Sequence, residues 1–134
     1  MPKLHNKPSR PTATRRVKQR VPSRSPQPFL RFYHSESLRA KTLDVLSTIE
    51  KATDAKPHRD TLANLVVELT DSGMEYFFLR PLKLAKAGFV VEQSARFGMA
   101  AATGMIASAT RTIIGRMDRA QVLAVCGYIR QLME

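Results

Sequence analysis

Few residues in this chain have the chemistry of a metal site, and they are far apart. The three histidines are His5, His34 and His58, and none follows a glutamate in the Glu-x-x-His spacing of di-iron helical bundles. A protein metal site needs several such ligands converging on one point. The sequence therefore predicts no metal site and no cofactor.

Cys126 is the only cysteine and the only candidate nucleophile of its type. A reactive thiolate needs a neighbouring base, and no histidine is close in the sequence. Its spacing from Val122 and Ile129 places it on an apolar helix face, which predicts a buried structural thiol. A single cysteine also excludes a disulfide within the chain. No secretory signal pattern is present, so we expect a cytoplasmic protein.

Two further patterns resemble parts of catalytic sites. His58, Arg59 and Asp60 copy three letters of a kinase catalytic loop, but the glycine-rich loop and the DFG element are missing. The second pattern is a polar side of one expected helix, opposite its apolar stripe, formed by Asp60, Asn64, Glu68, Asp71 and Glu75. We expect a solvated face there, or a docking strip for a basic segment. The sequence predicts no enzyme.

The net charge of +11 is concentrated at the start of the chain. Residues 1–28 hold eight of the 22 basic residues and no acid, together with six of the eight prolines. Such a segment buries too little apolar surface to fold, so we expect a disordered basic arm. It can bind phosphates without reading bases, and anionic lipid would attract it equally; alternatively, it only keeps the chain soluble. The expected polyanion-binding residues are Arg10, Arg15, Arg16, Lys18, Arg20 and Arg24.

Residues 29–134 show helical periodicity and no convincing strand. Ser35 is the expected N-cap of a helix over 36–53, and a second helix should run from Pro57 to Arg80. Pro81 predicts a kink or break. Asp118 and Gln121 have the spacing of a capping box for a last helix. The predicted fold is all-α, a small bundle of about four helices preceded by the arm.

The segment 88–115 is rich in glycine and alanine. Its uncharged run, residues 97–110, has 14 residues, whereas a membrane-spanning helix needs about 20. We therefore expect a long helix without a transmembrane span. Its small residues form a helix-packing seam along which another helix can approach closely, as in a bundle core or in a membrane helix dimer. The seam consists of Gly88, Ala95, Gly98, Ala102 and Ala109.

Around Pro81, phenylalanines alternate with cations. Such a basic-aromatic patch can hold nucleic acid or anionic lipid, although aromatic rings beside snorkelling lysines are also typical of a core helix. Phenylalanines off the main apolar stripes can also form an oligomer contact. The patch residues are Phe78, Arg80, Lys83, Lys86 and Phe89.

These features favour a non-enzymatic helical interaction module that forms a homo-oligomer and binds polyanions through its arm, above all nucleic acid without sequence specificity. One alternative is a peripheral protein of an anionic membrane or hydrophobic granule surface that uses the Gly/Ala-rich helix. Another is an adaptor whose groove takes a partner helix.

Overall fold

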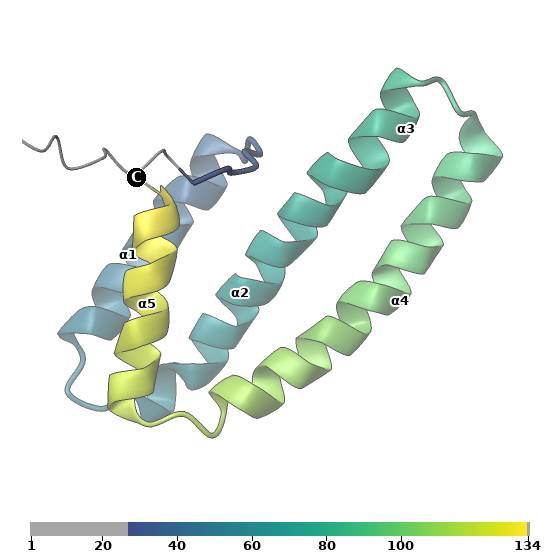
Figure 1. Ribbon diagram of the computed structural model, residues 1–134. Coiled ribbons are helices and arrows are strands. Elements are labelled where there is room, and N and C mark those ends of the chain that lie inside the picture. Colours follow the sequence, from purple (N-terminus) through teal and green to yellow (C-terminus); the bar gives the residue numbers. More distant parts are fainter. Residues whose placement is uncertain (1–26, 134) are drawn as a thin grey trace, which may run out of the picture. The chain divides into compact units, whose positions relative to one another are not determined.

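The computed structural model describes residues 27–133 (Figure 1). Residues 27–30 have no regular secondary structure and belong to a separate unit, and the remainder of the predicted arm lies outside the described residues. From Arg31 onward the chain forms one unit. All regular secondary structure in the described residues is helical, which confirms the all-α prediction.

Helix α1 (Glu36–Lys51) begins at the predicted cap. The Ser35 hydroxyl accepts a hydrogen bond from the Leu38 backbone N–H at 3.1 Å, which satisfies one of the free donors at the helix start. Glu36 in the first turn and Lys51 in the last turn suit the helix dipole. The sequence therefore encodes both ends of this helix.

The second helical stretch does not break at Pro81. A short 3₁₀ turn η1 (Lys56–His58) leads into α2 (Arg59–Met74), which passes through the π-helical turn η2 (Glu75–Leu79) into α3 (Arg80–Leu84). The Arg80 N–H donates to the Glu75 carbonyl, five residues back. This wider turn lies directly before the proline. It accommodates the proline ring and the absence of a backbone N–H at that position. Of the predicted kink or break, the break is absent, and the irregularity in the helix is the π turn directly before Pro81.

The chain instead reverses at residues 85–88. The Lys86 N–H donates to the Lys83 carbonyl and the Ala87 N–H to the Leu82 carbonyl, each at 3.1 Å, which is the hydrogen-bond pattern of a Schellman motif. Lys86 occupies its left-handed position with φ 51°. Gly88 follows with φ 97° and precedes the next helix, so a conformation that disfavours side chains occurs twice in this turn.

Replacing Lys86 with glycine is expected to raise the free energy of unfolding by about 0.5–1 kcal/mol, because glycine adopts the left-handed conformation without a Cβ penalty. Lys86→Ala is the matched control, since it removes the same charge but keeps a Cβ. Urea unfolding of the three proteins measures the difference. Equal stability of the glycine and alanine variants would contradict the turn geometry.

Helix α4 (Phe89–Ile114) runs back alongside α3 and α2, so the two stretches form an antiparallel hairpin (Figure 1). A final helix α5 (Arg119–Met133) packs against α1. Its predicted capping box is confirmed: the Gln121 N–H donates to the Asp118 carboxylate at 2.8 Å, and the Asp118 N–H donates to the Gln121 side-chain oxygen at 2.9 Å.

The core lies at one end of this hairpin. It joins α1, the first half of α2, the last turn of α4 and α5, while the far half of the hairpin is covered by neither α1 nor α5 (Figure 1). Two ion pairs connect these helices: Lys41 of α1 pairs with Glu68 of α2 at 2.5 Å, and Arg130 of α5 pairs with Glu50 of α1 at 3.1 Å. The core residues are Leu46, Ile49, Ala55, Leu62, Ala63, Leu65, Ile114, Val122, Cys126 and Ile129.

Candidate interaction surfaces

The single thiol lies inside the core. Cys126 is fully buried, with 0% of its surface exposed. Burial raises the pKa of the Cys126 thiol, and the carboxylate of Glu50 raises it further. Within residues 27–133, no group of three histidine, cysteine or acidic side chains is arranged to hold a metal ion. The thiol is therefore protonated at neutral pH and closed to a substrate.

Native Cys126 is expected to react with a water-soluble thiol reagent at least about 100-fold more slowly than in the urea-unfolded chain, because reaction requires opening of the core. The absorbance change of Ellman's reagent at pH 8 measures both rates. Because the pKa of the buried thiol is raised, the free energy of unfolding also depends on pH. The contribution of Cys126 to stability is complete below the pKa that the thiol has in the unfolded chain, and it is lost as pH rises through the higher pKa of the folded protein. Rapid labelling of the native protein would place the thiol outside the core.

The polar side of α2 is exposed at Asp60, Asn64, Asp71 and Glu75, which confirms the predicted solvated face. Asn64 accepts a hydrogen bond from the Arg111 guanidinium at 3.1 Å, and Asp71 accepts one from the Thr103 hydroxyl at 3.3 Å, both donors lying on α4. Glu68 pairs with Lys41 on α1. Because α2 lies between two helices, three residues of this exposed side, Asn64, Glu68 and Asp71, also make interhelical contacts. The docking strip stays a prediction.

The predicted basic-aromatic patch lies at and just below the far end of the hairpin. Lys83 lies in the last turn of α3, Lys86 lies in the reversal, and Phe89 opens α4 with 76% of its surface exposed. Phe78 and Arg80 lie about one turn earlier, where the guanidinium of Arg80 is 5.2 Å from the centre of the Tyr76 ring. The two long helices thus carry the patch away from the core (Figure 1).

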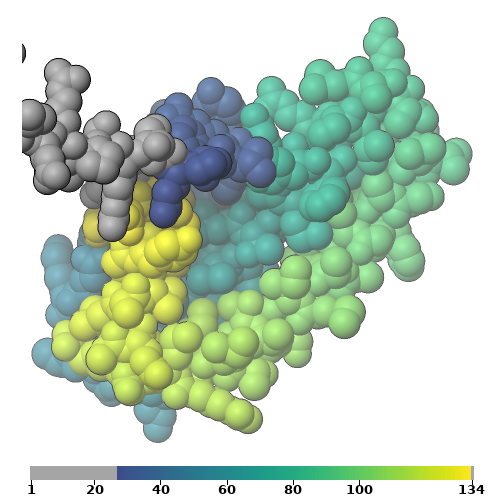
Figure 2. Space-filling view, viewed as in Figure 1, coloured from purple at the N-terminus to yellow at the C-terminus, as the bar shows by residue number. Residues whose placement is uncertain are grey.

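Two exposed aliphatic residues complete this surface. Leu84 ends α3 with 76% of its surface exposed, and Val90 follows Phe89 with 77% exposed. We call Leu84, Phe89 and Val90, with the cations Arg80, Lys83 and Lys86, the hairpin tip. In Figure 2, the teal-to-green end of residues 31–133 that contains this turn projects at the upper right. The sequence identified the cations and Phe89, but not the two aliphatic residues.

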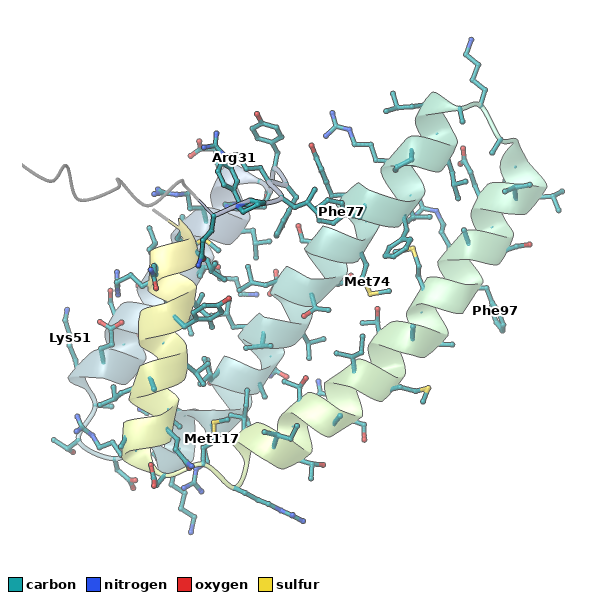
Figure 3. All side chains as sticks on the ribbon, in the orientation of Figure 1. Arg31, Lys51, Met74, Phe77, Phe97 and Met117 are labelled. Atoms are coloured by element: carbon teal, nitrogen blue, oxygen red, sulfur yellow. The ribbon has the colours of Figure 1, made fainter. Side chains whose placement is uncertain are left out.

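An apolar groove lies between the two arms of the hairpin. Its volume is about 410 Å³, and no charged side chain lines it. In Figure 3, Met74 points from α2 toward α4 into the space between the arms. The lining residues are Met74, Phe78, Leu82, Ala95, Gly98, Met99 and Ala102. The groove takes in three of the five predicted seam residues.

Only part of the seam packs against another helix of this chain, although α4 lies alongside α2. Gly88 precedes α4, and Gly98 and Ala109 are exposed. A Cβ added at Gly98 would meet no atom within 4 Å, so nothing in the chain uses the space that the missing side chain leaves. Ala95 and Ala102 alone are half-buried. Within the bundle, the predicted seam is therefore packed at Ala95 and Ala102 and exposed at Gly88, Gly98 and Ala109.

Helix α4 instead leaves a whole face without a partner. Only Ala107 and Ile114 are buried among its 26 residues. The opposite face carries no charge, and every residue on it is exposed. Phe97, 80% exposed, points away from α2 (Figure 3). We call this face the outward strip: Val90, Ser94, Phe97, Gly98, Ala101, Gly104, Met105, Ser108 and Thr112.

Sequence reasoning found part of the outward strip. Phe97 is one of the phenylalanines off the main apolar stripes that were predicted as an oligomer contact, whereas Met105, 76% exposed, was not identified. An apolar helix with small residues on two sides gives no signal for which side faces the protein. The six arm residues, Arg10 to Arg24, lie outside the described residues and are not placed by the structure.

No known family model, curated protein or solved structure matches this chain. Among residues 27–133, no helix combines the length and apolar character that crossing a bilayer requires. Function therefore has to be argued from the hairpin tip, the groove and the outward strip.

Proposed function

We propose that this protein is a non-enzymatic helical module that self-associates through the outward strip of α4 and presents basic arms to nucleic acid in the cytoplasm. The observation that carries the proposal is the unpartnered face of α4. Removing exposed apolar side chains such as Phe97 and Met105 from water favours association. Continuous apolar surface of this kind is typical of a protein contact.

The order of residues along the strip favours a second copy of the chain as the partner. Measured from Ala101, glycines lie three residues to either side, Phe97 and Met105 lie four to either side, and serines lie seven to either side. A two-fold axis at Ala101 therefore puts Phe97 level with the partner's Met105, and glycine level with glycine. Such self-complementarity is what an isologous antiparallel contact requires.

Sedimentation equilibrium of the full chain tests association, and cysteine cross-linking tests its geometry. In a Cys126→Ala background, Ala101→Cys should form a disulfide with its own copy, because the two Cα atoms then lie within the roughly 4.4–6.8 Å that a disulfide spans. Val90→Cys alone should not cross-link, but its mixture with Thr112→Cys should. A monomer at all concentrations would refute self-association, whereas cross-linking of Val90→Cys to itself would indicate a parallel pair.

The arm supplies the nucleic-acid part of the proposal, supported by its eight cations and its lack of acids. Neutralised phosphates release counterions, so binding to duplex DNA should weaken steeply with salt. A dimer presents two arms, and linkage raises their effective concentration. The folded part, with 14 basic and 11 acidic residues, contributes little to this field.

Replacing Arg15, Arg16, Lys18 and Arg20 together with glutamine is expected to lower the slope of log affinity against log salt by up to about 3.6, since each lost phosphate contact removes about 0.9. Fluorescence anisotropy of labelled duplex DNA measures the slope in the full chain. The control replaces four cations of the folded part, Arg39, Lys51, Lys56 and Arg116. If both variants lose the same slope, the charge of the whole protein binds DNA and the arm has no special role.

A further inference from the structure

The hairpin tip joins exposed apolar side chains to cations in one short turn. Leu84, Phe89 and Val90 each expose about three quarters of their surface (76%, 76% and 77%), and these residues lie within the seven that span the reversal. Single exposed apolar residues need no explanation, but three neighbours at the end of a hairpin form a patch. Val90 also begins the outward strip, but Leu84 and Phe89 lie outside that strip and need a partner of their own.

Charge identifies the chemistry of that partner. Between Glu75 and Glu92 the chain has three cations, Arg80, Lys83 and Lys86, and no acidic residue. A symmetric contact between two tips would bring these like charges together, which is unfavourable. Nucleic acid would satisfy the cations but would leave Leu84 and Val90 in water, since aliphatic side chains offer no ring on which a base can stack. The partner must be anionic at its surface and apolar just below it.

We propose that the hairpin tip binds an anionic membrane surface, with Leu84 and Phe89 in the boundary between headgroups and acyl chains and the two lysines at the lipid phosphates. Interfacial segments bind by burying apolar area and by attraction of Lys and Arg to anionic lipid. The surface is peripheral and does not require a membrane-spanning helix. It extends the function proposed above and does not depend on self-association.

The fold presents the tip in a fixed position. The Schellman hydrogen bonds of Lys86 and Ala87 and the left-handed backbone of Gly88 define the turn. The 26 residues of α4 span about 39 Å at 1.5 Å per residue, so the tip stands far from the buried Ile114 at the other end of the helix. A bilayer can therefore receive the tip without contacting the core.

A tryptophan at Phe89 tests the proposal directly, because the chain contains no tryptophan. Phe89→Trp in the full chain should show a blue-shifted emission with vesicles of phosphatidylcholine containing about 30% phosphatidylserine, a mole fraction within the range that gives a negative surface potential. Brominated acyl chains should quench it. The matched control is Tyr128→Trp, on an exposed position of α5 (62% exposed), whose emission should not change.

A second pair of variants separates the tip from the arm. Lys83→Gln with Lys86→Gln should weaken binding to these vesicles about 25-fold, because each lysine near an anionic surface contributes about a fivefold change in affinity. Lys51→Gln with Lys56→Gln removes the same charge at the other end of the hairpin and should change binding little. Vesicle co-sedimentation at several salt concentrations measures all three proteins.

Each other outcome overturns the proposal. If the indole at position 89 stays accessible to acrylamide while the protein co-sediments, the arm alone binds the vesicles. If bromolipids quench the indole at 128 as strongly as that at 89, the contact is not the tip. Shielding of position 89 without vesicles assigns the tip to a protein copy, and shielding by duplex DNA assigns it to nucleic acid. Ala101→Glu, a substitution at the centre of the outward strip, leaves the tip unchanged. Vesicle binding by this variant therefore tests the tip separately from self-association.

Discussion

Replacing Leu62 with alanine is expected to lower the free energy of unfolding by roughly 2–5 kcal/mol, the range for large-to-small changes in a packed core. Leu62 is fully buried (0% exposed) and belongs to the cluster that joins α1, α2 and α5. The loss combines the transfer of the deleted atoms into water with the cavity that remains. For a domain of about 100 residues, 3 kcal/mol corresponds to a fall of about 12–24 °C in Tm.

Leu84→Ala is the matched control. It deletes the same atoms from a side chain that is 76% exposed, so its effect should stay within about 0.5 kcal/mol. Urea unfolding at one fixed protein concentration measures both, since self-association would otherwise add to the apparent stability. If Leu84→Ala costs as much as Leu62→Ala, the core is not at the end of the hairpin where the structure has it.

Replacing Ala101 with glutamate is expected to weaken self-association about 100-fold, equivalent to about 2.7 kcal/mol. Ala101 lies at the centre of the outward strip, so a two-fold axis there places two carboxylates against each other in an apolar contact. Like charges facing each other in an interface cost several kcal/mol. Sedimentation equilibrium gives the dissociation constants.

The control for this substitution is Ala124→Glu, at an exposed position of α5. It adds the same charge outside the outward strip and should leave the dissociation constant within about twofold, since surface charges far from a contact act weakly. Both variants should keep the far-ultraviolet circular dichroism of the parent, because neither alanine is buried. Unchanged association of Ala101→Glu would exclude the centre of the strip as the contact.

Local signals in the sequence determined the helices and several of their ends. Ser35 caps α1, and Asp118 and Gln121 cap α5, with the hydrogen bonds that their spacing predicts. Such caps act within four residues, so no distant contact is needed to find them. The spacing of Cys126 from Val122 and Ile129 likewise predicted its burial.

Only the tertiary structure decided what the helices do with their faces. Pro81 predicted a kink or break, but the π turn before it lets the helix continue to Leu84, and the chain reverses at residues 85–88 instead. The side of α4 that packs could not be deduced, because small and apolar residues occur on several sides of this helix. Which side is buried depends on the helices that pack against it. With α1 and α5 packed at one end of the hairpin, the outward strip and the hairpin tip stay exposed, and these exposed surfaces suggest the protein's partners.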